Sequence, residues 1–231
     1  MDETLPVPPV MGHKSGRPRR GTEAERLDGL IQAATAIFLK EGYGLASIDK
    51  IATAAGVSTR TIYERFKNKG DLMAAVITRL VDRDMAVMGG GAKLDRLEPA
   101  EALTLVGQIM VGRLADPESG ALFRIIAAEA QRFPELTAKM RASGKKRMED
   151  ALAAYLRGQV ECGSLALTDP ASAAVLFLQM ITAQVHEYLL FESPQAVASL
   201  DRCAHVARVV QLFLYGAAPR PDPSANGRHQ P

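Results

Sequence analysis

The sequence has few residues that could form covalent or metal cross-links. It contains two cysteines and no tryptophan, and aromatic residues make up 5% of its 231 residues. Cys162 and Cys203 lie far apart and belong to no CxxC or Cys/His cluster. This argues against a disulfide scaffold or a structural zinc site and fits a reducing cytoplasm. We therefore expect neither a metal nor a cofactor.

Long hydrophobic runs are also missing. The longest, Ala171–Ile181, is interrupted by Ser172 and Gln179 and is too short to span a bilayer. The N-terminal residues place prolines before basic residues, whereas a signal peptide has its charges first and an apolar stretch after them. These features predict a cytoplasmic protein without a membrane segment.

The common catalytic motifs are absent. The sequence has four histidines (His13, His186, His205 and His229) and no GxSxG, HExxH, Walker or GxGxxG pattern. We therefore expect a protein that is not an enzyme. An enzyme whose site lies in a helical cavity without such motifs is the alternative.

Charge is unevenly distributed along the chain. The whole sequence has a formal charge of +2. Residues 1–70 contain eleven Lys/Arg against eight Asp/Glu, a balance of +3, and the remainder contains seventeen against eighteen, a balance of −1. Within residues 12–21 there are four basic residues and no acidic one. The basic N-terminal end favours an anionic partner that the small total charge conceals.

The chain reads as helical throughout, between two tails. Residues 1–21 and 219–231 are rich in proline and glycine and have no apolar periodicity, which predicts a flexible basic arm and a disordered tail. Between them, apolar residues recur at helical spacing and no strand-like alternation is evident. We predict an all-α protein of about nine helices, with one helical domain at 22–70 and a second at 71–218.

Residues at predicted helix ends set the boundaries. Thr22 and Glu25 form a capping-box pattern, and Gly42 stands where a glycine commonly ends a helix. Asn68 can cap a fourth helix that extends to Met88. Later prolines at or near helix starts predict five further helices, at Glu98–Leu114, Glu118–Arg132, Pro134–Cys162, Pro170–Phe191 and Pro194–Tyr215. The predicted helix Pro134–Cys162 contains Ser143-Gly144, a pair that can kink it.

The segment Ser47–Phe66 has the pattern of a helix-turn-helix. Ala52 is small enough to let a second helix cross nearby, Gly56 permits a tight turn with positive φ, and Val57 fills the angle between the helices. Ser58 can then cap the following helix. The pattern predicts that this following helix faces outward and enters a major groove of DNA.

Polar residues of the outward helix suit contacts with DNA. Arg60 can bind guanine O6 and N7 together, and Thr59 or Thr61 can contact a thymine methyl or a phosphate. The hydroxyl of Tyr63 suits a phosphate. Two short helices packed in an ordinary bundle would have the same spacing, so the motif alone leaves both interpretations open.

Neighbouring positions add further candidate contacts. Ser47 and Lys69 lie at helix N-termini, where the helix dipole favours an anion. The arm Arg17-Pro18-Arg19-Arg20 is suited to a minor groove, although a basic tail that only aids solubility has the same composition. The candidate DNA contacts are Arg17, Arg19, Arg20, Ser47, Ser58, Thr59, Arg60, Thr61, Tyr63 and Lys69.

Several of these motifs occur together in one order. They are Gly16-Arg17-Pro18, Glu41-Gly42-Tyr43, Ile51-Ala52-x-Ala54-Ala55-Gly56-Val57-Ser58 and Thr61-Ile62-Tyr63-x-x-Phe66-x-x-Lys69-x-x-Leu72. Residues 16–72 thereby resemble the DNA-binding domain of the tetracycline-repressor (TetR) family of bacterial regulators. Gly70 departs from the family, which often has an acidic residue there. The resemblance implies that Ser47, Thr59, Arg60, Thr61, Tyr63 and Lys69 face double-stranded operator DNA.

The resemblance also implies that residues 22–70 form the DNA-binding domain. It implies that residues 71–218 form a helical ligand-binding and dimerisation domain, with a ligand cavity and a homodimer formed by the last two helices. The residues support a large apolar interface independently, because Pro170–Phe191 is apolar nearly all round and the helix after it has too broad an apolar face for one neighbour. A thick monomeric core is the alternative. The expected function is a repressor that binds a palindromic operator and is released by a small hydrophobic ligand.

The stretch Phe123–Leu136 and the pair Asp169-Pro170 resemble the C-terminal domain of AefR-like repressors within this family. Such a cavity would have apolar, adaptable walls with a few polar anchors. The candidate ligand contacts are Met110, Arg113, Phe123, Ile126, Phe177, Met180, Gln184 and His186. A C-terminal domain that docks a protein partner is the alternative, and a solid core without a cavity would favour it.

Overall fold

The computed structural model describes residues 22–89, 93–192 and 194–216. Within these ranges every regular element is a helix, which confirms the predicted all-α class. The predicted basic arm with Arg17, Arg19 and Arg20, the predicted tail at 219–231 and the residues Gly90-Gly91 lie outside the described part of the chain.

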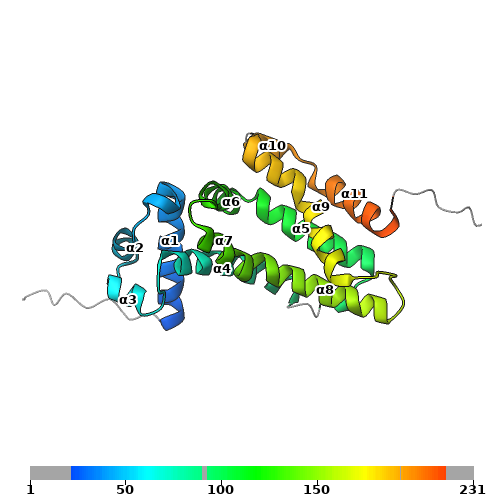
Figure 1. Ribbon diagram of the computed structural model, residues 1–231, viewed down its shortest axis with the longest axis horizontal. Coiled ribbons are helices and arrows are strands. Elements are labelled where there is room, and N and C mark those ends of the chain that lie inside the picture. Colours follow the sequence, from blue (N-terminus) through cyan, green and yellow to red (C-terminus); the bar gives the residue numbers. More distant parts are fainter. Residues whose placement is uncertain (1–21, 90–92, 193, 217–231) are drawn as a thin grey trace, which may run out of the picture.

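The N-terminal lobe consists of three helices and the first half of a fourth (Figure 1). The helices are α1 (Glu23–Leu45), α2 (Ile48–Ala55), α3 (Thr59–Tyr63) and α4 (Lys69–Val87). The predicted capping box of α1 is confirmed, since Thr22 N donates to Glu25 Oε2 at 2.6 Å and Glu25 N donates to Thr22 Oγ1 at 3.3 Å. Asn68 caps α4 by accepting from Asp71 N at 3.0 Å, also as predicted.

The second lobe is a bundle of longer helices. Its elements are a 3₁₀ turn η2 (Leu94–Arg96), α5 (Pro99–Ala115), α6 (Pro117–Glu129), α7 (Pro134–Met140), a π-helical turn η3 (Arg141–Lys145), α8 (Lys146–Glu161), α9 (Pro170–Phe191), α10 (Pro194–Ser199) and α11 (Arg202–Tyr215). The predicted span of α9 is confirmed at both ends. By length and composition α9 could also cross a membrane, a test that core helices pass too; here it packs against α5, α8 and α11.

The described residues form eleven α-helices, where about nine were predicted, because two predicted helices are interrupted. The span Pro134–Cys162 is broken by η3, in which Gly144 lies so close to α4 that a Cβ would be 3.3 Å from Ile77 and Val81. The span Pro194–Tyr215 is broken before Asp201, which caps α11 by accepting from Ala204 N at 2.9 Å. Close packing against α4 therefore accounts for the first break, and the local cap at Asp201 accounts for the second.

Two apolar cores hold the molecule together, and α4 contributes to both. Leu72, Met73 and Val76 of α4 are buried in the N-terminal core, and Met88 at its C-terminal end is buried in the core of the second lobe. The N-terminal core also includes Leu122 and Ile126 of α6 and Leu136 of α7. The two lobes therefore share an apolar contact region. The boundary predicted at residues 70–71 falls in the first turn of α4.

Polar contacts join the lobes at the end of α1. Glu129 Oε1 of α6 accepts from Gly44 N at 3.1 Å, and a Cβ at Gly44 would be only 2.8 Å from that oxygen. The rings of Tyr43 and Phe133 meet edge to face, with centroids 5.0 Å apart. Lys139 of α7 forms an ion pair with Asp71 of α4 at 2.6 Å. These contacts fix the N-terminal lobe against α6 and α7.

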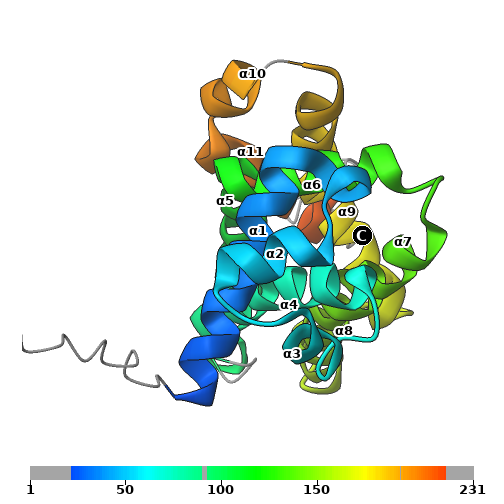
Figure 2. The same cartoon turned by 90° about the vertical axis from the view of Figure 1, so that its left-hand side faces the viewer.

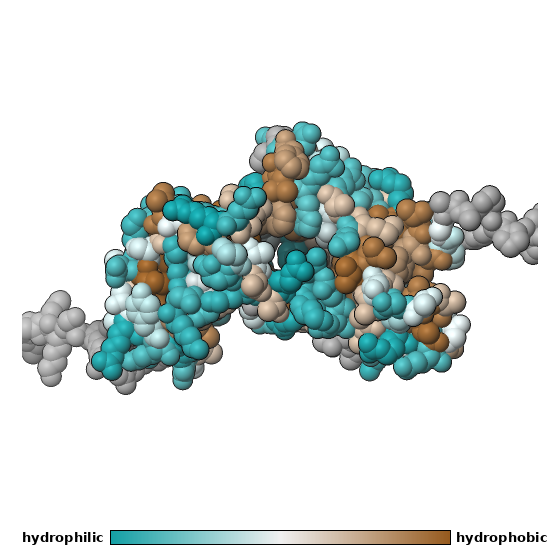
Figure 3. All heavy atoms as spheres, in the orientation of Figure 1, coloured by the Kyte–Doolittle hydropathy of each residue, from teal (hydrophilic) through white to brown (hydrophobic). Residues whose placement is uncertain are grey.

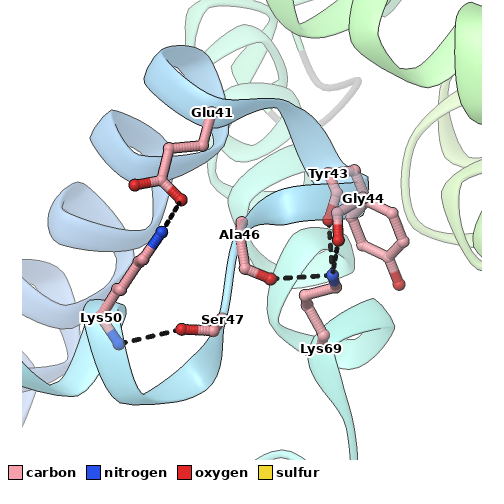
Figure 4. A network of polar contacts seen from close by, with 7 residues as sticks. All are labelled: Glu41, Tyr43, Gly44, Ala46, Ser47, Lys50 and Lys69. Atoms are coloured by element: carbon pink, nitrogen blue, oxygen red, sulfur yellow. Dashed lines mark hydrogen bonds and ion pairs between the residues drawn. The ribbon is translucent and has the colours of Figure 1, made fainter.

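The side chain of Lys69 closes the corner between α1 and α2 (Figure 4). Its Nζ donates to the carbonyl oxygens of Tyr43 at 2.5 Å, Gly44 at 3.1 Å and Ala46 at 2.8 Å. It also lies 4.5 Å from the centroid of the Tyr43 ring. Burial lowers the pKa of Lys69, and the nearby Glu129 carboxylate opposes that shift. Three carbonyls left at a helix end thus share one cation.

We expect Lys69→Met to destabilise the protein, because three carbonyl oxygens would lose their donor in a partly buried corner. Hydrogen bonds from a charged group of this kind contribute about 1–3 kcal/mol in total. Urea unfolding would measure the loss. Lys67→Met removes the same charge from an exposed position two residues away and serves as the control. Equal stability of the two variants would contradict the role assigned to Lys69.

Candidate DNA interface and ligand cavity

The helix-turn-helix has the local geometry that its sequence predicts. Gly56 adopts φ +65°, and the N–H of Val57 donates to Ala52 O at 3.0 Å across the turn. Ser58 caps α3 by accepting from Thr61 N at 3.1 Å, and Ile62 is fully buried beneath the helix. The turn and the buried Ile62 fix α3 relative to α2, so the remaining side chains of α3 face outward.

Helix α3 belongs to the N-terminal lobe, which faces the viewer in Figure 2, and the predicted contacts on it are largely accessible. The Arg60 side chain is 88% exposed and Tyr63 is 56% exposed, while Thr61 is exposed and Thr59 is half-buried. The Nε of Arg60 lies 2.9 Å from Glu64 Oε1, one helical turn further on. An exposed guanidinium on a short, rigidly placed helix can reach base edges in a major groove.

Two predicted DNA contacts also have structural roles. Ser47 caps α2 by accepting from Lys50 N at 3.3 Å (Figure 4). The ammonium of Lys69, which the sequence predicts to favour an anion at the start of α4, is bound by the three carbonyls of the α1–α2 corner. The sequence could not show this, because the three carbonyls belong to residues more than twenty positions away.

A cavity of about 490 Å³ lies where the two lobes meet. Figure 3 shows the molecule hollowed near the centre of this face, between the N-terminal lobe and the bundle. The cavity walls come from α4, α5, α6, α7, η3, α8 and α9 and are mainly apolar. This volume is within the usual range for sites that hold small organic molecules.

Five of the eight predicted ligand contacts line the cavity, namely Met110, Arg113, Phe123, Ile126 and His186. Three do not. Phe177 is fully buried against Phe213, with ring centroids 5.1 Å apart, and Gln184 donates to Tyr188 Oη at 2.8 Å. Met180 is half-buried and absent from the walls. Helical spacing in the sequence shows which apolar residues of α9 can be buried. It does not show which neighbouring helix, or whether the cavity, each side chain contacts.

Sequence reasoning missed the contribution of α4 to the cavity. Ile77, Leu80 and Val81 form its wall on that side, together with Arg141 and Lys145 of η3. The apolar stripe of α4 was visible in the sequence, but it fits packing against any neighbour. Only the tertiary structure shows that the apolar residues near the start of α4 lie in the N-terminal core and that those further along the helix line the cavity.

A buried ion pair lies beside the cavity. Arg113 Nη1 of α5 is 2.8 Å from Asp84 Oδ2 of α4, and the two side chains are 19% and 12% exposed. Burial raises the pKa of Asp84, and the positive charge of Arg113 opposes that shift. Burial likewise lowers the pKa of Arg113, opposed by Asp84. Each charge therefore compensates the other where water is largely excluded.

His186 and Phe123 form a flat wall on another side. Their rings stack with centroids 4.4 Å apart and an angle of 9° between the planes. Burial lowers the pKa of His186, and the charges of Lys145 and Arg113 lower it further. These effects favour the neutral form of the imidazole, whose ring offers a planar surface. In the described residues no group of three or more His, Cys, Asp and Glu side chains is placed to hold a metal.

A helix-turn-helix with an accessible recognition helix, joined by one long helix to a bundle with a cavity, defines a DNA-binding transcriptional regulator. Residues 30–76 match the family described as bacterial regulatory proteins of the tetR family. Residues 101–217 match the C-terminal domain of AefR-like transcriptional repressors. The chain belongs to the TetR family of bacterial transcriptional regulators, as its motifs predicted.

Individual relatives agree with this assignment. The chain is 27% identical over 206 residues to the transcriptional repressor BepR of Brucella suis biovar 1 (strain 1330), covering 86% of this chain and 94% of BepR. It is 41% identical over 71 residues to the transcriptional activator FasR of Mycolicibacterium smegmatis, covering 29% of this chain and 32% of FasR. A TetR-family regulator structure from Mesorhizobium loti MAFF303099 matches with TM-score 0.68 and 26% identity, over 84% of this chain and 98% of that one.

We expect Glu64→Gln to raise affinity for DNA, because Glu64 is ion-paired with Arg60 in the free protein and its negative charge would repel DNA phosphates that approach α3. An exposed pair of this kind contributes about 0.2–1 kcal/mol, which corresponds to an increase of up to about fivefold. Fluorescence anisotropy with a DNA fragment would measure it. Glu118→Gln, an equal charge change on α6, is the control. Weaker DNA binding by Glu64→Gln would contradict this account.

Proposed function

We propose that the protein is a homodimeric repressor that binds a palindromic operator and is released by a small hydrophobic ligand. The observation that supports this most directly is the position of α4. The same helix is buried in the DNA-binding lobe through Leu72, Met73 and Val76 and forms a wall of the cavity through Ile77, Leu80 and Val81. A ligand that displaces this wall would therefore move the recognition helix.

Dimer formation is supported by apolar residues that remain exposed on the last long helices. Leu176, Leu190 and Phe191 of α9 and Leu212 of α11 are each at least 44% exposed. In an isologous interface the same patch on both copies would bury this surface. A dimer also presents two recognition helices, which must fit successive major grooves about 34–36 Å apart. A change of angle at α4 would alter that spacing.

A repressor released by a ligand is favoured over a regulator that docks a protein partner. A solid core would have supported the second, whereas a cavity of about 490 Å³ lies where the two lobes meet. The relatives BepR and FasR are a repressor and an activator, so they do not agree on the sign of regulation. The experiment that identifies the operator and the controlled genes is selection of genomic fragments by the purified protein, followed by sequencing. We place the protein in the bacterial cytoplasm, with DNA as its partner, no membrane partner and no catalytic role.

We expect Arg60→Ala to lose most of the specific affinity for the selected operator, because Arg60 is the α3 candidate whose exposed side chain can make a bidentate contact to guanine. One bidentate contact to guanine contributes about 1–3 kcal/mol of discrimination. Anisotropy titrations at two salt concentrations would measure both affinity and its salt dependence. Arg157→Ala removes an equal charge from an exposed position on α8. Binding that is insensitive to salt, or equal for both variants, would refute the DNA-binding assignment.

A further inference from the structure

Cations, but no carboxylates, line the cavity. Arg113, Arg141 and Lys145 are among its lining residues, which include neither aspartate nor glutamate. Most of the remaining wall is apolar. An apolar ligand in this cavity would lie next to these cationic side chains. The cations therefore favour a ligand that also carries a negative charge.

The three cations differ in their surroundings. Arg141 and Lys145 are exposed on η3, and Lys145 lies 3.6 Å from Glu149, so water screens their charges. Arg113 is mostly buried, and its position is fixed on two sides: Nη1 lies 2.8 Å from Asp84, and Nη2 lies 3.3 Å from Sδ of Met110, another wall residue. A ligand charge would interact most strongly with Arg113, where the effective dielectric constant is lowest.

The present counter-ion of Arg113 is not a wall residue. Asp84 belongs to α4, is buried and does not line the cavity, and among the described residues its Oδ2 has no polar partner other than Arg113. The charge of Arg113 is therefore what compensates this oxygen. Removing the partner of a buried charge is strongly unfavourable, so Asp84 holds α4 against α5 only while Arg113 remains available to it.

We infer that the ligand is an apolar molecule with one anionic group, a carboxylate or a phosphate ester, which displaces Asp84 as the counter-ion of Arg113. This inference rests on the proposed function and specifies its ligand. Once displaced, the Asp84 carboxylate must reach water or take up a proton. Burial raises its pKa, which favours proton uptake. Either change breaks the ion pair between α4 and α5, and the C-terminal half of α4 then loses one of the contacts that hold it to the bundle.

The experiment compares probes that differ only in the head group. Calorimetric titrations of the full chain would use dodecanoate, dodecyl phosphate and the neutral dodecan-1-ol. Asp84→Asn removes the competing carboxylate, so both anions should bind about fivefold or more tightly than to the unmodified protein, with dodecan-1-ol unchanged. The matched control is Asp82→Asn on the same helix. Asp82 forms an exposed ion pair with Arg147 at 2.7 Å and does not line the cavity.

A second variant tests Arg113 itself. Because Arg113→Met would leave Asp84 buried without a partner, the double variant Asp84→Asn/Arg113→Met removes both charges together. This variant should bind dodecanoate and dodecan-1-ol with similar affinity. A gain with only one of the two anions assigns the ligand to that class. Absence of saturable dodecanoate and dodecyl phosphate binding, an equal gain in Asp82→Asn, or a preference for anions that survives in the double variant would overturn the inference.

The same proteins separate this inference from the proposed function. Operator affinity without any probe should fall in Asp84→Asn, because the variant lacks the ion pair between α4 and α5, and should be unchanged in Asp82→Asn. If the unmodified protein binds its operator but Asp84→Asn alters neither operator affinity nor anion binding, then only the inference about Asp84 and Arg113 is wrong. If the unmodified protein binds no operator, the proposed function itself fails.

Discussion

The burial of α4 in two different cores is the constraint on which the rest of the structure depends. Its first turns are buried in the N-terminal core, where α4 packs against α1 and α7, its middle faces the cavity, and Met88 at its end is buried in the bundle. Close-packed cores resist small local adjustment, so a displacement of one part of a rigid helix is transmitted along it. The contacts of Lys139 with Asp71 and of Glu129 with Gly44 hold the near end of α4 and the end of α1 against α6 and α7.

Much of the DNA-binding lobe could be predicted because its signals are local. A capping box at Thr22, a glycine with positive φ at Gly56 and N-caps at Ser47, Ser58 and Asn68 each depend on residues within four positions of one another. The same local order places Arg60 and Tyr63 on the exposed side of α3. Their exposure followed from the sequence because Ile62, between them, is the residue that the core requires.

The cavity and its charges could not be predicted in the same way, because they depend on residues far apart in the sequence. Asp84 and Arg113 are 29 positions apart and become partners only when α4 and α5 pack together. Phe177 and His186 lie on one helix, yet one is core and the other cavity wall. The three carbonyls that bind Lys69 are a similar case. Helical periodicity predicts a buried face, but tertiary packing decides what that face contacts.

The central claim is that ligand binding in the cavity and operator binding are coupled through α4. The most direct test is whether the ligand and the operator each lower the protein's affinity for the other. Dodecanoate affinity would be measured for the free protein and for the protein saturated with its selected operator, and operator affinity with and without saturating dodecanoate. If one helix couples the two sites, each ligand weakens the other by the same factor. Identical dodecanoate affinities for the free and the operator-bound protein would contradict the account.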